Sequence, residues 1–271
     1  MKVLVGTGSR EHRHPMDTLD ASRLGIAGRP SDEERTSVSL AVLRASPEEG
    51  GDETHGNGGS PRRLDVDAER VFSSRNERGE LKEVMGTILA DESLTRVVVA
   101  AGGGDPDAFL AAVLARLMAI ERLDVEIGYV THTTTPATEN YSLPVGEQAA
   151  AFAVSAPAVS TPLIRDDTGA ALVGIGHHRG RDGHKLEGEG IVDDTRLFAG
   201  ETAGVTVRPT PQAPGVRASL DRRWRRRWVA GRAAQTGGPA IVVVRDGVVA
   251  PKTVRRSTFY RHHDDWKLVR P

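Results

Sequence analysis

Glycines and carboxylates lie together in the segment Gly102–Asp107, where their types and spacing suit the binding of a phosphate group. The β-branched run Val97–Val99 before this segment predicts a buried strand, and Asp105 with Pro106 predicts the beginning of a helix, with Asp105 as its cap. In a strand-to-helix turn of this kind, the backbone N–H groups of the turn and of the first helical residues bind an anion, usually a phosphate. We therefore place the candidate chemistry at this turn.

The two carboxylates of this turn, Asp105 and Asp107, would repel a bare phosphate. A metal ion such as Mg²⁺ between them would remove the repulsion, because Mg²⁺ binds carboxylates and substrate phosphates together. A tight turn with Asp105 as the helix N-cap, and with no ligand, is an equally good interpretation.

Polar residues also follow the next expected strand, in the segment 131–141. Thr138 and Asn140 are candidates for hydrogen bonds to a nucleotide, and the hydroxyl-rich run Thr131–Thr135 could also hold phosphate. The alternative, slightly favoured by the residues alone, is a polar loop in which Asn140 caps the following segment.

Asp246 is the third candidate, in the segment Ile241–Val248. As a general base it would accept a proton from a substrate hydroxyl within hydrogen-bond reach. Asp246–Gly247 is also a typical tight hairpin turn, and a turn without chemistry is the simpler interpretation.

An arginine-tryptophan segment gives the strongest local charge, and it consists of Arg222, Arg223, Trp224, Arg225, Arg226, Arg227 and Trp228. Such a segment can bind an anionic membrane surface or lipid headgroups, with tryptophan at the interface. An exposed strand or loop that charge protects from aggregation is the alternative we favour.

Seven of the nine histidines occur in three groups, which are His12 with His14, His177 and His178 with His184, and His262 with His263. A metal site would need glutamate or cysteine partners at a recognised spacing, and none is present. We expect these histidines in solvent-facing loops.

The composition fits a soluble cytoplasmic protein, and peripheral association with a membrane is the alternative location. The 271 residues carry a formal net charge of -1, so no global field favours nucleic acid, and we expect no nucleic-acid partner. No cysteine is present, which excludes disulfides. Met1–Gly6 has a short strand pattern and not that of a signal peptide, and no apolar run approaches the length of a membrane span.

Residues 1–156 alternate between strand and helix patterns, which predicts an α/β domain with a parallel sheet covered by helices. The expected strands are 2–5, 96–100 and 124–130, and the expected helices are near 79–91, 105–121 and 146–155. Residues 32–44 suit a helix or a strand equally. Residues 46–63 are rich in glycine and predict a mobile loop.

Residues 157–271 predict a second, all-β, sandwich-like domain. The strands are expected to be divided by turns at Asp166–Gly169, Gly180–Gly183, Gly188–Gly190, Pro209–Pro211, Thr236–Pro239 and Arg245–Gly247. Phe259, Tyr260 and Trp266 are expected packing anchors. An edge of this β half could pair two copies of the chain as a homodimer.

This order of elements resembles the diacylglycerol kinase and NAD kinase superfamily. The family signature, a strand followed by Gly-Gly-Asp-Gly-Thr and a helix, is similar to Gly103–Asp107, where two glycines and the aspartate match. The lipid-kinase branch has a second motif, Pro-x-Gly-Thr-x-Asn-Asp, which Pro136–Tyr141 matches at Thr138 and Asn140. Its third motif, Asp-Gly-Glu, is matched by Asp246–Gly247, with Val248 in place of the glutamate.

The resemblance implies a phosphotransferase that uses ATP and Mg²⁺ to phosphorylate a hydroxyl of a lipid or lipid-like alcohol. It places Gly102, Gly103 and Gly104 at the nucleotide phosphates, Asp105 at the metal and Asp246 as the base, in a cleft between the two domains. Because all three motifs are incomplete, a kinase fold that only binds or scaffolds is the alternative. NAD kinase activity ranks third.

Overall fold

The computed structural model describes residues 39–46, 70–102, 104–222 and 226–271, which belong to one compact unit, Val38–Pro271. Several sequence predictions lie outside the described residues. These are strand 2–5, His12, His14, most of the loop 46–63, Gly103, Arg223, Trp224 and Arg225.

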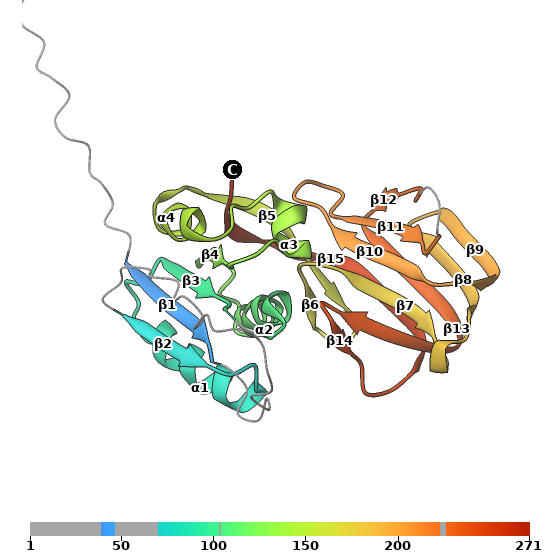
Figure 1. Ribbon diagram of the computed structural model, residues 1–271, viewed down its shortest axis with the longest axis horizontal. Helices are drawn as coiled ribbons and strands as arrows, with labels where there is room; N and C mark the ends of the chain where they lie inside the picture. The colour runs from blue at the N-terminus through green and yellow to red at the C-terminus, as the bar shows by residue number, and fades with distance from the viewer. Residues whose placement is uncertain (1–38, 47–69, 103, 223–225) are drawn as a thin grey trace, which may run out of the picture. The chain divides into compact units, whose positions relative to one another are not determined.

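A parallel sheet forms the N-terminal part of this unit (Figure 1). Its strands lie in the order β2-β1-β3-β4, and their bounds are β1 Leu40–Ala45, β2 Val71–Ser74, β3 Arg96–Ala100 and β4 Glu126–Val130. The ambiguous segment 32–44 therefore contains a strand from Leu40 onward. The connections include four helices, α1 Arg78–Leu89, α2 Pro106–Ala119, α3 Pro136–Tyr141 and α4 Glu147–Ser155.

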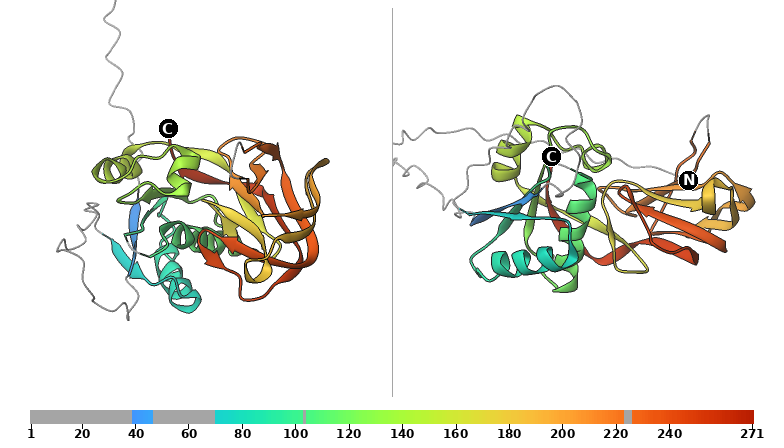
Figure 2. Two further views of the ribbon diagram at one scale, coloured as in Figure 1. Left: turned by 45° about the vertical axis from the view of Figure 1, so that its right-hand side comes forward. Right: turned by 60° about the horizontal axis from the view of Figure 1, so that its bottom comes forward.

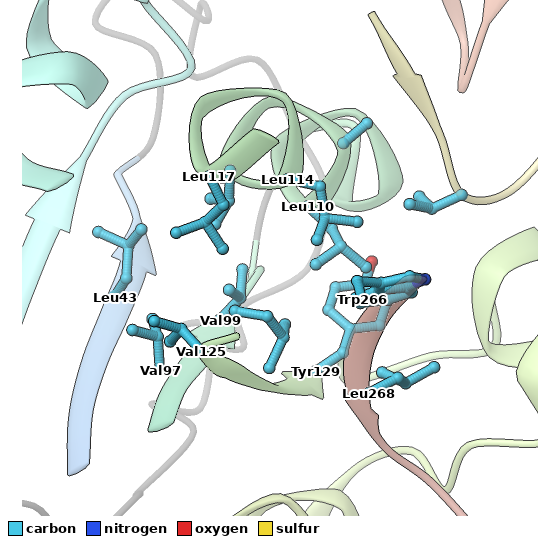
Figure 3. Packing of buried hydrophobic residues seen from close by; sticks show 14 of the residues in the cluster. Leu43, Val97, Val99, Leu110, Leu114, Leu117, Val125, Tyr129, Trp266 and Leu268 are labelled. Atoms are coloured by element: carbon cyan, nitrogen blue, oxygen red, sulfur yellow. The ribbon is translucent and has the colours of Figure 1, made fainter. Parts of the chain in front are cut away.

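Both faces of this parallel sheet are covered, because side chains alternate along each strand. Leu43, Val97 and Val99 pack with the leucines of α2 in one buried cluster (Figure 3). Val42 and Val98 point to the opposite face and pack with the alanines of α4. The apolar runs of these strands are continuous because both faces of the sheet are covered.

Helix α4 lies very close to the sheet because β4 has a glycine at the contact. A Cβ on Gly128 would stand 2.8 Å from the Cβ of Ala153 and 2.9 Å from its carbonyl oxygen. The buried guanidinium of Arg96 binds the carboxylate of Glu126 and donates to the carbonyl oxygens of Ala153 and Val154. A cation at the C-terminal end of a helix also interacts favourably with the helix dipole.

The rest of the chain is formed almost entirely of strands (Figure 2). They are β5 Ala158–Asp166, β6 Ala171–Leu172, β7 Gly176–Gly180, β8 Leu186–Val192, β9 Thr195–Thr202, β10 Val205–Pro209, β11 Val216–Leu220, β12 Val229–Gly231, β13 Ala233–Arg245, β14 Val248–Val249 and β15 Val254–Val269. Their inner side chains form a second core cluster, which includes Leu172, Val207 and Phe259. The prediction that this half consists of strands is confirmed, and its sandwich-like arrangement stays a prediction.

The last strand, β15, connects this β half to the parallel sheet. It pairs antiparallel with β13 and β5, and its end pairs parallel with β4 through Lys267 and Leu268. Phe259 of β15 lies in the second core cluster, whereas Trp266 lies in the first, against Tyr141. The result is one continuous mixed sheet, and a domain boundary at residue 156 stays a prediction.

Two of the expected turns are wrong. Gly188–Gly190 lies inside β8, and Thr236–Pro239 lies inside β13, where the two strands pair with each other. A Cβ on Gly188 would overlap the carbonyl oxygen of Gly237. The glycines therefore allow a close approach of two strands, which is the second common use of glycine in a sheet.

Candidate functional site

The glycine turn after β3 is open to solvent. Gly102 and Gly104 are exposed, and a Cβ added to either would meet no atom within 4 Å. Gly104 has a φ of 62°, a left-handed conformation that suits glycine. The turn leads into α2, where Pro106 occupies the first turn, as expected.

Asp105 is the N-cap residue of α2 by position, but its side chain makes no capping hydrogen bond, and the prediction of a side-chain cap is wrong. The reason is the neighbouring turn between β13 and β14. The carboxylate of Asp105 faces this turn, so that a Cβ on Gly247 would stand 3.1 Å from Oδ1 of Asp105. The exposed Asp105 therefore lies beside the third sequence motif, which comes from the other end of the chain.

Asp246 and Gly247 form the tight turn that the sequence predicts, with φ values of 46° and 89°. The side chain of Asp246 is nevertheless only 5% exposed. Its carboxylate accepts hydrogen bonds from the backbone N–H groups of Val173, Gly174 and Ile175, at 3.1, 2.8 and 2.8 Å. The turn thus places a buried carboxylate at the connection between β6 and β7.

Burial raises the pKa of Asp246 to about 7, and the nearby Asp107 also raises it, while the three backbone hydrogen bonds act in the opposite direction. A carboxylate whose pKa is raised in this way is a better proton acceptor than an ordinary aspartate. A side chain in this state can accept and release a proton with little change in free energy.

Asp107 is the second buried carboxylate of the site. It accepts a hydrogen bond from the Tyr129 hydroxyl at 2.8 Å and from the backbone N–H of Ala137 at 2.9 Å. A Cβ on Gly174 would overlap Oδ2 of Asp107 and would stand 2.9 Å from Oδ1 of Asp246. Gly174 therefore separates two carboxylates that lie close together.

Helix α3 contributes the residues of the second motif. Thr138 and Thr135 form a reciprocal capping box at its beginning, which occupies the hydroxyl of Thr138. Asn140 lies inside the helix, so the prediction that it caps the following segment is wrong. Its Nδ2 donates to the carbonyl oxygens of Val173 and Gly174, at 3.0 and 2.6 Å.

The segment Val173–Ile175 is thus the centre of the arrangement. Asp246 binds its N–H groups and Asn140 binds its carbonyl oxygens, while Asp107 lies against Gly174. The structure brings all three sequence motifs together around this segment. Sequence reasoning missed the segment, because a short apolar run with one glycine carries no signal of a site.

The location is also typical of ligand sites in α/β sheets. β2 lies next to β1 on one side of the sheet, and β4 lies next to β3 on the other side. The direction in which successive strands are added to the sheet therefore changes between the neighbours β1 and β3. Ligands of open α/β sheets bind outside the carboxyl ends of the strands at such a reversal. The glycine turn lies at the carboxyl end of β3.

No family model matches the sequence, and no curated protein matches it. Solved structures do match the fold. A diacylglycerol kinase from Bacillus anthracis str. Sterne superposes with a TM-score of 0.64 and 9% identity, over 88% of this chain and 98% of that chain. An NAD kinase from Archaeoglobus fulgidus, in complex with ATP, superposes with a TM-score of 0.50 and 14% identity, over 85% of this chain and 93% of that chain.

The chain shares its fold with these two kinases. The resemblance drawn from three incomplete motifs is therefore confirmed at the level of the fold. At 9 to 14% identity the superposition does not transfer residue roles, and the chemistry has to be argued from this chain's own side chains.

The arginine-tryptophan segment precedes Asp246 in the chain and follows Asp105 and Asp107. Of its described residues, Arg222, Arg226 and Arg227 are exposed. Trp228 is half-buried beneath the guanidinium of Arg217, 5.0 Å from the ring centre. Binding of a membrane surface through this segment stays a prediction. No helix in the described ranges is long and apolar enough to span a bilayer.

The expectation of loop histidines is wrong for His177 and His178 on strand β7 and for His262 and His263 on strand β15. Of these four, His178 and His262 are buried. The ring of His178 is bound on both sides, by the hydroxyls of Thr236 at 2.8 Å and Ser257 at 3.0 Å. Burial lowers the pKa of His178 to about 3, so the ring is neutral at ordinary pH.

Proposed function

We propose that the protein is a phosphotransferase that uses ATP with Mg²⁺ to phosphorylate a hydroxyl group of a lipid or lipid-like alcohol. The observation that carries the proposal is the convergence of Asp105, Asp107 and Asp246 at the open N-terminus of α2. The superfamily fold supports the proposal, since one neighbour is described as a diacylglycerol kinase and another as an NAD kinase in complex with ATP.

The phosphates of the nucleotide would bind at the exposed backbone of Gly102 and Gly104 and at the first N–H groups of α2. This helix has 14 residues, and its N-terminus carries a partial positive charge. Because glycine has no side chain at either position, a phosphate can approach the backbone closely.

Mg²⁺ fits Asp105 better than Asp107. Asp105 is exposed and makes no capping hydrogen bond, whereas both oxygens of Asp107 already accept hydrogen bonds. A protein site for Mg²⁺ commonly consists of one or two carboxylates with substrate phosphates and water. The ion would neutralise charge on the transferred group, and Asp107 would position α3 and Tyr129 beneath it.

Asp246 is the proposed general base. Its Oδ2 accepts only one backbone hydrogen bond, from Val173, which leaves a lone pair for a substrate hydroxyl. In the transfer, Asp246 takes the proton of the acceptor hydroxyl. The acceptor oxygen then forms a bond to the terminal phosphorus of ATP, and the bond from that phosphorus to the bridging oxygen of ADP breaks.

A binding protein without catalysis is the second candidate. The observation that favours it is Val248, which is 49% exposed at the place where the lipid-kinase motif has a glutamate. Such a protein would bind nucleotide without transferring phosphate. The two candidates differ in whether phosphate is transferred to an alcohol and in whether Asp246→Asn lowers the rate of that transfer.

Nucleotide binding is tested by thermal unfolding. Mg²⁺ with ATP is expected to raise the Tm of the wild type, because a ligand at 100 times its Kd stabilises the native state by about 2.7 kcal/mol. Asp105→Asn is expected to remove most of this rise. Asp182→Asn is the matched control, since Asp182 is an exposed aspartate of the distant β7–β8 connection. An unchanged Tm of the wild type at millimolar ATP would contradict the proposal.

Catalysis is tested by phosphate transfer from labelled ATP to a panel of alcohols. Asp246→Asn is expected to keep the nucleotide-induced rise in Tm and to lower the rate of transfer by about 10²-fold to 10⁴-fold. The wild-type rate is expected to rise with pH through about 7, since only the ionised carboxylate accepts a proton. Nucleotide binding without transfer to any alcohol would favour the binding protein.

A further inference from the structure

A cavity of about 570 Å³ lies beside the carboxylates, between α1, α2, the β5–β6 turn and the β13–β14 turn. Helix α2 and strands β6 and β14 lie side by side in this region (Figure 1). The wall formed by α2 consists of five alanines at helical spacing, Ala108, Ala111, Ala112, Ala115 and Ala119. Methyl side chains on one helix face leave room where larger residues would have filled the space.

The same cavity has cationic groups on its walls, contributed by Lys82, Arg116 and Arg245. Arg245 pairs with Asp166. The Nε of Arg116 is buried and has no hydrogen-bond partner among the residues that the structure describes. A buried N–H group without a partner is unfavourable, so a ligand anion at Arg116 would relieve a cost that the free protein carries.

Asp246 lines the opposite end of the cavity. Helix α2 begins beside Gly247, next to Asp246, and continues to Arg116, ten residues after Pro106. At 1.5 Å per residue this is about 15 Å along the helix axis. A long side chain on a helix points back toward the N-terminus of the helix, so the distance between the Arg116 guanidinium and Asp246 is shorter than this length.

We propose that this cavity binds the acceptor, and that the acceptor is a single-chain alcohol with an acidic group at the end remote from its hydroxyl. The hydroxyl lies at Asp246, the aliphatic chain lies along the alanines of α2, and the carboxylate or phosphate binds Arg116. This inference rests on the proposed function for the role of Asp246. It adds an anionic group to the lipid-like alcohol of the proposed function.

The test uses two probes of equal chain length, ω-hydroxydecanoate and decanol, and measures their binding by calorimetry in the absence of nucleotide. The wild type is expected to bind ω-hydroxydecanoate at least about tenfold more tightly than decanol, because a hydrogen bond between charged groups is stronger than one between neutral groups. Arg116→Gln is expected to remove this preference. Arg179→Gln, at an exposed arginine of β7 outside the cavity, is expected to keep it.

Ala115→Leu is a second variant, at a half-buried position of the cavity wall, and it narrows the cavity without changing a charge. It is expected to weaken the binding of both probes, while circular dichroism shows an unchanged fold. Equal affinity of the wild type for the two probes, or a preference that survives Arg116→Gln, would overturn the inference.

The failure of this inference differs from the failure of the proposed function. If ω-hydroxydecanoate binds through Arg116 but neither it nor any alcohol of the panel is phosphorylated with Mg²⁺ and ATP, the cavity is an anion-selective site and the phosphotransferase proposal is wrong. If other alcohols are phosphorylated and ω-hydroxydecanoate shows no preference over decanol, the phosphotransferase proposal stands and the acidic acceptor is wrong.

Discussion

At the scale of single residues, the partners of a polar side chain come from distant parts of the sequence. Asp246 is a typical turn residue in its local sequence, and its burial depends on Val173–Ile175, about 70 positions earlier. Residue type therefore predicted that Asp246 forms a turn but not that its pKa is raised. The same holds for His178, whose environment is set by β13 and β15.

His178 makes stability depend on pH. Its pKa is about 3 in the folded protein, against an ordinary 6.5, so the folded state binds fewer protons between these values. The contribution of His178 to the free energy of unfolding is therefore expected to fall as the pH is lowered from about 6.5 toward 3, with a slope that approaches about 1.4 kcal/mol per pH unit. Urea unfolding at several pH values measures this slope.

The variant His178→Gln keeps a side chain that can bond to Thr236 and Ser257, and it does not titrate. The difference in unfolding free energy between the wild type and this variant is expected to fall as the pH is lowered from about 6.5 toward 3, because only the wild type loses the contribution of His178. Asp246 acts in the opposite direction, because a raised pKa gives stability that is lost as the pH rises through about 7, but it contributes equally to both proteins. His184→Gln, at an exposed histidine, is the control and keeps the wild-type slope.

At the scale of elements, the sequence predicted the strand-turn-helix around Gly102–Asp107 to within two residues, because a buried strand and a proline-initiated helix have strong local patterns. It did not predict the six-residue helix α3, which is too short to show a period. Local sequence could not distinguish the two structural roles of glycine, which forms turns in some places and allows close packing of strands in others.

Gly128 tests the close packing of α4 on the sheet. Gly128→Ala is expected to destabilise the protein by about 1 to 3 kcal/mol, because the new methyl group would overlap Ala153. Gly86→Ala is the matched control, since a Cβ on Gly86 of α1 meets nothing within 4 Å, and it is expected to stabilise by about 0.4 to 1 kcal/mol. Urea unfolding of both variants measures the difference. Equal effects of the two substitutions would contradict the packing argument.

At the scale of the whole molecule, β15 is the element that sequence reasoning could not place. The sequence indicated Phe259, Tyr260 and Trp266 as packing anchors, but it did not show that they belong to one strand or that this strand returns to the parallel sheet. Because β15 contributes Phe259 to one core cluster and Trp266 to the other, the two clusters share one continuous strand. We therefore expect the parallel sheet and the β half to unfold together.

Hydrogen exchange followed by mass spectrometry measures this coupling. Phe259→Ala removes a large buried side chain from the β half and is expected to cost about 3 to 5 kcal/mol. If unfolding is cooperative, the protection of amides in β3 falls by the same factor as that of amides in β13. The reciprocal variant, Leu114→Ala in α2, is expected to lower the protection of β13 in the same way. A loss of protection confined to the half that carries the substitution would show that β15 connects two independently stable parts.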